Sequence, residues 1–229
     1  MNRYVTGLLI IAALAVPAFA ADNELTEQER RDGWILLFDG KSLAGWTTNE
    51  GQPSARPVEQ GSLNPHRCGG YMLIHERQWE NFILTLDFKI SHGCNTGVFF
   101  RTSPLEPLPG KDVGYNGLEV AIDDTRENGL HDTGAIYDLV AANSNVMRPA
   151  GQWNRLVLTC NKNIVEVRIN PRTVTMLDLD QWTEKGKRPN GTPHQFGVAY
   201  KDHPRRGYIG LQDHGGDCWY KNIKIQPLE

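Results

Sequence analysis

The sequence has few cysteines, little surplus charge and, beyond its first twenty residues, no long apolar run. Four cysteines occur in 229 residues, and no two of them form a CxxC motif, so neither a zinc knuckle nor a dithiol redox centre is indicated. Lys and Arg number 24 against 27 Asp and Glu, which gives a formal net charge of −3. Nothing in this balance favours nucleic acid or anionic lipid, so we expect neither as a partner.

The apolar stretch at the N-terminus has the features of a targeting segment. Arg3 precedes the apolar run 7–16, which is short for a bilayer span, and Ala18-Phe19-Ala20 has the small-x-small pattern of a cleavage site. We therefore predict that residues 1–20 are a cleaved signal peptide and that 21–229 form a single domain. The protein is then expected in the periplasm or secreted, with no membrane attachment.

Export permits disulfide bonds, and the cysteine positions suggest one pair. Cys68 and Cys94 both lie in Gly-rich loops at strand edges, and we predict that they are joined. Cys160 ends one strand-like segment and Cys218 begins another. The sequence leaves open whether these two pair or remain as buried thiols.

Helix signals are scarce, whereas strand signals run through the chain. Thr26 and Glu29 have the spacing of a capping box, which predicts one short helix that ends at Gly33. Apolar residues occupy every second position of 81–90, and the turn sequences 161–163 and 170–172 separate further strands. The pattern predicts an all-β fold, a two-sheet antiparallel β-sandwich of the jelly-roll type.

Three of these segments carry polar residues on the face opposite their apolar ones. They are 95–101, 117–124 and 210–215. We hypothesise that the three strands lie in one sheet, because their polar faces would then form a single site. The side chains brought together would be Arg101, Glu119, Gln212 and His214. Two long loops, 103–114 and 181–206, are expected to wall this site.

Glu119 is the central candidate for chemistry. Asp123 lies on the same strand face, but four residues of regular strand separate the two Cα atoms by roughly 13 Å. A glycosidase needs its carboxyls about 5–9.5 Å apart, so this pair serves only if a bulge intervenes. Glu119 is otherwise expected to act with His214, an imidazole suited to acid or base catalysis near neutral pH. An ion pair between Glu119 and Arg101 is the structural alternative.

Other side chains are candidates for binding substrate or metal. Arg101 would hold sugar hydroxyls or an oxyanion, or would only neutralise Glu119. Lys201 would stabilise an enolate, or would be solvated surface. Asp123, Asp124 and Asp132 are oxygen donors for a candidate divalent cation, Ca²⁺ or Mg²⁺, although they lack a loop signature. The residues predicted to bind substrate are Gln212, Asn95, Asp123, Tyr137, Lys201 and Trp46.

Six segments, in order along the chain, resemble a known family. They lie at 33–46, 95–101, 117–120, 133–138, 151–154 and 207–215, and the last, GYIGLQDHG, is the most specific. The chain resembles the bacterial 3-keto-disaccharide hydrolase domain family. The resemblance implies a concanavalin A-like sandwich and cleavage of glycosides already oxidised at C3.

That activity suits the candidate residues. A ketone at C3 acidifies the C2 hydrogen, so a base can remove it while the C1 substituent leaves, and water then adds. Glu119 and His214 would supply base and acid in either order. Arg101, Lys201 or a divalent ion would stabilise the enolate oxygen. Two alternatives remain: a non-catalytic lectin-like module, and a laminarinase-like hydrolase of intact glucans, which the spacing of Glu119 and Asp123 disfavours.

Overall fold

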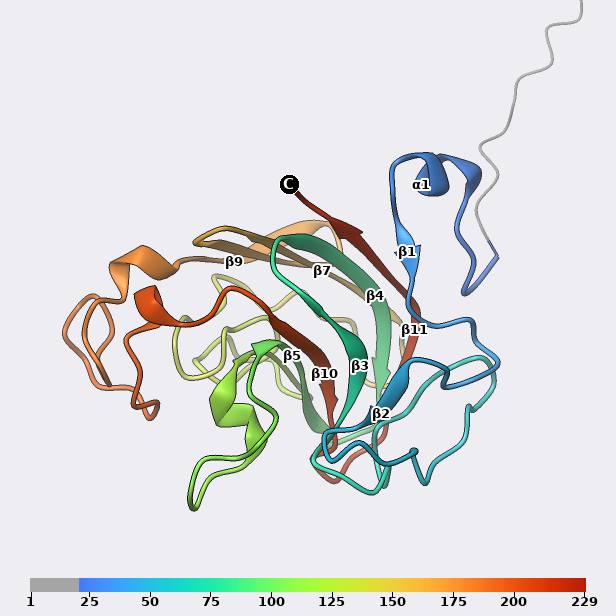
Figure 1. Cartoon of the computed structure of the whole chain (residues 1–229), viewed down its shortest axis with the longest axis horizontal. Coiled ribbons are helices and arrows are strands. Elements are labelled where there is room, and N and C mark those ends of the chain that lie inside the picture. The colour runs from blue at the N-terminus through green and yellow to red at the C-terminus, as the bar shows by residue number, and fades with distance from the viewer. Residues whose placement is uncertain (1–20) are drawn as a thin grey trace, which may run out of the picture.

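The computed structural model describes residues 21–229, and the predicted signal peptide, 1–20, lies outside the described residues. Two sheets face each other across an apolar core (Figure 1). In spatial order, the six-stranded sheet consists of β1 (Ile35–Leu36), β11 (Cys218–Pro227), β4 (Phe82–Ile90), β7 (Asn154–Asn161), β8 (Ile164–Ile169) and β9 (Arg172–Asp178). The five-stranded sheet consists of β2 (Trp46–Thr48), β3 (Met72–Trp79), β10 (Gly207–Gln212), β5 (Asn95–Thr102) and β6 (Leu118–Asp123).

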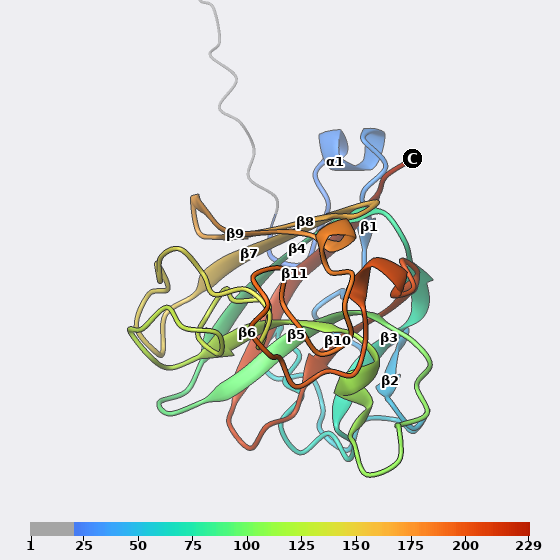
Figure 2. The same ribbon diagram turned by 90° about the vertical axis from the view of Figure 1, so that its left-hand side faces the viewer.

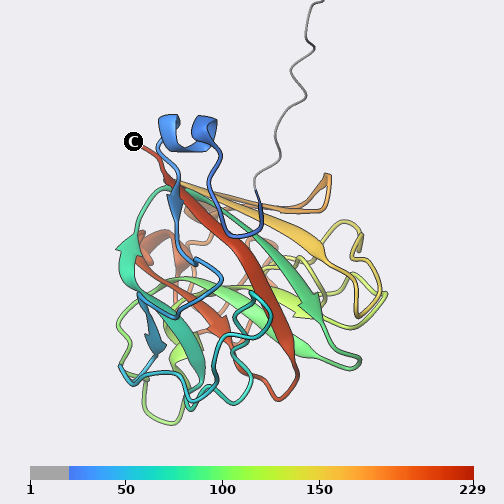
Figure 3. The same cartoon turned by 90° about the vertical axis from the view of Figure 1, so that its right-hand side faces the viewer.

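Every strand pair in the two sheets is antiparallel, which confirms the predicted fold class. Figure 3 shows the six-stranded sheet from outside, with α1 (Glu27–Arg31) beside its edge strand β1. Thr26 Oγ1 accepts from the Glu29 backbone N–H, and Glu29 Oε2 accepts from the Thr26 N–H, so the predicted capping box is confirmed. No helix in residues 21–229 has the length and apolarity needed to cross a membrane.

Strand β4 shows how the alternating pattern builds the core. Its five apolar residues at even positions, from Phe82 to Ile90, are fully buried between the sheets. Burying one such side chain contributes about 1.5–3 kcal/mol. The predicted turns at 161–163 and 170–172 join β7 to β8 and β8 to β9 as hairpins. In this sheet the periodicity alone therefore identifies both the strands and their buried faces.

The three strands expected to share a sheet are neighbours in the five-stranded sheet, in the order β10, β5, β6. Gly210 pairs with Phe99, and Phe99 pairs with Glu119. Val98 and Val120 lie in the core. Phe99 and Glu119, their next neighbours along the same strands, therefore face outward. This outer face is covered by loops (Figure 2), and the candidate site lies between them and the sheet.

Arg101 departs from the alternation. Phe100 and Arg101 of β5 oppose the single residue Ile209 of β10, which is a β-bulge. Arg101 adopts the left-handed conformation, with φ of 53°. The bulge changes the direction of its side chain, so the expectation that Arg101 shares the outer face with Glu119 is wrong.

Candidate active site

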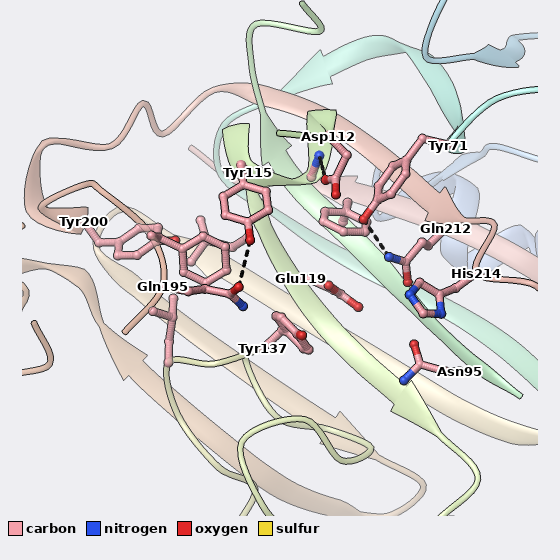
Figure 4. Close-up of a pocket in the computed structure, with 16 residues that line it drawn as sticks. Tyr71, Asn95, Asp112, Tyr115, Glu119, Tyr137, Gln195, Tyr200, Gln212 and His214 are labelled. Carbon is pink, nitrogen blue, oxygen red and sulfur yellow. Dashed lines mark hydrogen bonds between the residues drawn. The ribbon is translucent and has the colours of Figure 1, made fainter. Parts of the chain in front are cut away.

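A cavity of about 180 Å³ lies on the outer face of the five-stranded sheet. Its base is formed by side chains from β5, β6 and the end of β10, namely Asn95, Phe99, Glu119 and Gln212. His214 lies just beyond β10 and Tyr137 follows β6, and both also line the cavity (Figure 4). Four predicted site residues besides Glu119 are therefore gathered around it: Asn95, Tyr137, Gln212 and His214.

The two predicted wall loops do enclose the site. The first contributes Asp112 and Gly114, with Tyr115 just beyond its predicted end, and the second contributes Gln195, Phe196 and Tyr200. The Tyr115 hydroxyl donates to Gln195 Oε1 at 2.8 Å, which joins the end of the first loop to the second. The first loop is anchored by an apolar cluster outside the main core, made of Met72, Ile74, Phe99 and Val113.

Glu119 lies over the backbone of Gly97 on the neighbouring strand. A Cβ atom at position 97 would lie 2.5 Å from Glu119 Cγ and 2.6 Å from Cδ, and closer still to Oε1. Gly97 thus leaves the room that the carboxyl of Glu119 occupies. A glycine is needed here for close approach rather than for backbone conformation.

The carboxyl of Glu119 has no compensating partner in the described chain. Glu119 is 8% exposed, and its side chain has no hydrogen-bond or ion-pair partner within residues 21–229. Burial, with a smaller contribution from the negative Asp112, raises the pKa of Glu119 from 4.5 to about 8. At neutral pH the group is therefore mostly a neutral carboxylic acid, able to donate a proton.

Arg101 lies outside this site. Its side chain is fully buried, and Nη2 donates to the carbonyl oxygens of Lys162 at 2.8 Å and Glu80 at 3.2 Å. Those carbonyls belong to the turns between β7 and β8 and between β3 and β4, so Arg101 connects the two sheets at one end. No Arg or Lys from residues 21–229 lines the cavity, which explains why the Glu119 carboxyl is not held ionised.

Replacing Arg101 with Ala is expected to lower stability but not catalysis. Two turn carbonyls would lose their donor and a cavity would open, for a cost of roughly 2–4 kcal/mol in the free energy of unfolding. Turnover per folded molecule should stay within about threefold of wild type. Urea unfolding measures the loss of stability, and steady-state kinetics under conditions where the variant stays folded measure the turnover. A hundredfold loss of kcat/KM at unchanged stability would instead show that Arg101 takes part in catalysis.

Three other predicted binding residues do not line the cavity. Trp46 is buried in the core, where Nε1 donates to the Leu37 carbonyl at 2.7 Å, so it is unavailable to a sugar ring. Lys201 lies in the short 3₁₀ helix η3 (Tyr200–Asp202) and is exposed, while its neighbour Tyr200 lines the cavity instead. Asp123 ends β6 opposite Asn95 and is only half-buried beyond the cavity.

Two of the three predicted metal ligands, Asp124 and Asp132, accept hydrogen bonds within loops. No group of three or more His, Cys, Asp or Glu side chains within residues 21–229 is arranged to hold a metal ion. Asp124 accepts from the Gly93 N–H, and Asp132 accepts from the Thr125 hydroxyl. These carboxylates stabilise loops, so the geometry does not support a Ca²⁺ or Mg²⁺ site there.

The predicted disulfide is wrong. All four cysteines are free and buried. The Cys68 thiol contacts the Gly70 carbonyl, whereas Cys94 packs against Gly216. Burial raises the pKa of Cys94 to about 12, so it is an unreactive thiol. Cys160 and Cys218, left open from sequence, are likewise buried thiols.

Sequence reasoning missed several lining residues, aromatic side chains among them. Tyr71 precedes β3, and its hydroxyl accepts a hydrogen bond from Gln212 Nε2 at 2.8 Å. Burial, and then the charge of Asp112, raises the pKa of Tyr71, which keeps the phenol protonated. Tyr115 and Phe196 pack with ring centroids 5.3 Å apart. The length of the two loops predicted the walls, but no local signal identified the side chains that line the cavity.

These features define a class of protein. A lectin typically presents an exposed aromatic platform, whereas here a β-sandwich encloses a buried acid, an imidazole, amides and phenols in one small cavity. The class is that of β-sandwich enzymes acting on a small polar ligand. The chain belongs to the family described as the 3-keto-alpha-glucoside-1,2-lyase-like domain, which matches residues 33–226.

Individual relatives agree with this family. A protein of Bacteroides thetaiotaomicron named 3-keto-disaccharide hydrolase is 26% identical over 86% of this chain and 79% of its own length. A crystal structure of a candidate glycosyl hydrolase from Parabacteroides distasonis has a TM-score of 0.69 and 27% identity, and covers 85% of this chain and 99% of its own. A second such structure, with a TM-score of 0.73, 24% identity and coverage of 91% and 100%, shows the shared fold. The predicted hydrolase class is confirmed.

Proposed function

We propose that this protein cleaves the glycosidic bond of 3-keto-glycosides by elimination followed by hydration, with net hydrolysis. The observation that carries the proposal is Glu119, a buried acid without a partner in the described chain, enclosed with His214 in a cavity that suits one sugar ring. The family description names a lyase and the bacterial relative is named a hydrolase. Elimination and hydration in sequence account for both names.

The chemistry requires a base, an acid and a donor to the enolate. The base removes the C2 proton, which the adjacent C3 ketone acidifies, and the electron pair moves into a C2–C3 enolate. Collapse of the enolate expels the C1 oxygen, which takes a proton from the acid. Water then adds across the C1–C2 double bond, and the sugar and its former aglycone are both released. No pair of carboxylates at fixed separation is needed, which is consistent with Glu119 as the one buried carboxyl among the described residues that line the cavity.

The site supports one assignment of these roles. Glu119 holds its proton at neutral pH and is assigned as the acid that protonates the leaving oxygen. His214 faces the same cavity and is assigned as the base (Figure 4). With Arg101 elsewhere, the neutral amide N–H of Asn95 replaces it as the proposed donor to the enolate oxygen.

We also propose that the protein is exported and that its mature part is one domain. Residues 1–20 have the pattern of a cleaved signal peptide, so we place the mature protein, 21–229 as one domain, in the periplasm or outside the cell. There it would meet carbohydrate substrates already oxidised by another enzyme.

The test compares a 3-keto-disaccharide with its unoxidised parent, each with and without chelator. We expect release of sugar from the oxidised substrate alone, unaffected by chelator. Binding without release would favour the lectin-like module, and release from the unoxidised parent would favour an ordinary glycoside hydrolase. Loss of activity with chelator would show that a divalent cation takes part.

The pH profile should report the protonation of Glu119. If its proton is needed, kcat/KM falls tenfold per pH unit above about pH 8, the pKa of the free enzyme's carboxyl. Initial rates between pH 6 and 10 measure this, with circular dichroism as a control for folding. A rate that instead rises to a plateau near pH 8 would reverse the assignment and make Glu119 the base.

A further inference from the structure

A side-chain oxygen at the end of β10 is buried without a partner. Gln212 is 4% exposed, and its Nε2 donates to the Tyr71 hydroxyl at 2.8 Å. Its Oε1 has no hydrogen-bond partner within residues 21–229. Buried polar atoms in proteins are nearly always paired. An orphaned acceptor in the wall of a cavity therefore indicates a donor on the ligand.

The surroundings of Tyr71 determine which end of the amide faces the cavity. The Asp112 carboxylate faces the phenol and, as a carboxylate, can only accept, so it attracts the Tyr71 O–H proton. The phenol oxygen is then left to accept, and only the NH₂ group of Gln212 can donate to it. Asp112 is itself held by the Gly114 N–H at 3.0 Å. The order Asp112, Tyr71, Gln212 thus turns Oε1 toward the cavity (Figure 4).

The position of Gln212 relates this acceptor to the reacting carbons. Leu211 pairs with Val98, which places Gln212 beside Gly97, the residue over which Glu119 lies. The oxygen is therefore next to the proposed acid rather than at a remote end of the cavity. An amide oxygen can accept from a hydroxyl but cannot pair with a ketone, so the C3 carbonyl of the substrate must face elsewhere, toward Asn95.

We propose that Gln212, oriented by Tyr71 and Asp112, selects substrates that carry a free hydroxyl next to the ketone, at C2 or C4. This inference rests on the proposed function. Gln212 contacts the substrate and determines specificity, whereas Tyr71 and Asp112 are positioning residues. The substrate class is a monoketo sugar with an intact vicinal hydroxyl, and a sugar deoxygenated at that carbon is rejected.

The test measures kcat/KM for a 3-keto-glucoside and for its 2-deoxy and 4-deoxy counterparts. Wild-type enzyme should prefer the parent over one counterpart by roughly 10- to 100-fold. In Gln212→Met the same preference should fall to within about threefold of unity, and Tyr71→Phe should lie between. A merely structural defect would lower kcat/KM for all three substrates by the same factor and leave their ratios unchanged. Ratios near unity in wild type, or unchanged in Gln212→Met, overturn the proposal.

A binding measurement separates this inference from the proposed function. The 3-keto form of 1,5-anhydroglucitol has no substituent on C1 outside the ring, so it contains no glycosidic bond to cleave. Calorimetry should give the same 10- to 100-fold preference in Kd over its deoxy counterparts, again lost in Gln212→Met. Absence of turnover on every 3-keto-glycoside would end the proposed function, while equal Kd values, or no binding, would end the inference.

Discussion

Replacing Glu119 with Gln is expected to lower kcat for a 3-keto-glycoside by roughly 10²- to 10⁴-fold. An amide keeps the shape and a hydrogen-bond donor but has no proton to transfer to the leaving oxygen. Glu119→Ala, which lacks the donor as well, should be slower still. Nearly equal activity in wild type and Glu119→Gln would show that position 119 needs only to donate a hydrogen bond, and the acid would then lie elsewhere.

The same substitution is expected to stabilise the fold at alkaline pH. An unfolded chain releases the Glu119 proton above pH 4.5, while the folded protein keeps it to about pH 8. The folded state therefore binds more protons in this window, and wild-type stability falls as pH rises. Glu119→Gln has no such pH-dependent loss of stability. Its free energy of unfolding should therefore equal that of wild type below pH 4.5 and exceed it by roughly 3–5 kcal/mol above pH 8.

Urea unfolding at several pH values checks this advantage. An inactive variant that is also more stable at pH 8.5 would identify Glu119 as a group retained for function at a cost in stability. If the two proteins unfold alike at every pH, the carboxyl is already ionised in the folded state, and its assignment as an acid is wrong.

Replacing Gly97 with Ala is expected to lower activity by roughly 10²-fold although no catalytic residue is itself replaced. The new Cβ would overlap the Glu119 side chain, with Cγ at 2.5 Å, so the carboxyl must move. A displacement of about 1 Å commonly costs some 10²-fold in rate. Overpacking should also lower the free energy of unfolding by about 1–3 kcal/mol. Steady-state kinetics and urea unfolding measure the two effects.

Gly197 provides a matched control for this experiment. It lies in the second wall loop, and a Cβ there would meet nothing within 4 Å. Like Gly97, it does not have a positive φ, so Ala introduces no backbone strain at either position. Gly197→Ala should keep kcat/KM within about twofold and stability within about 0.5 kcal/mol. Full activity in Gly97→Ala would mean that the observed position of Glu119 is unimportant.

The candidate site could be predicted to the extent that it depends on strand periodicity. Because side chains alternate along a strand, Glu119, Asn95 and Gln212 could be assigned to one face before their neighbours were known. Arg101 has the same spacing, but a bulge at its position changes the direction of its side chain. A single residue in the left-handed conformation is a local event that a polar and apolar pattern does not encode.

The sandwich, its three adjacent site strands and the two loops that enclose them could be predicted from residue order alone, since they follow from period-two burial and from turn residues. The environment of each polar group depends instead on how distant segments pack. The pKa of Glu119 depends on burial by loops distant in the chain and on the absence of a lining cation in the described residues. Tyr71, Asp112 and Gln212 meet only because three separate segments converge. Such electrostatic and hydrogen-bonded environments arise from long-range packing, which no local pattern specifies.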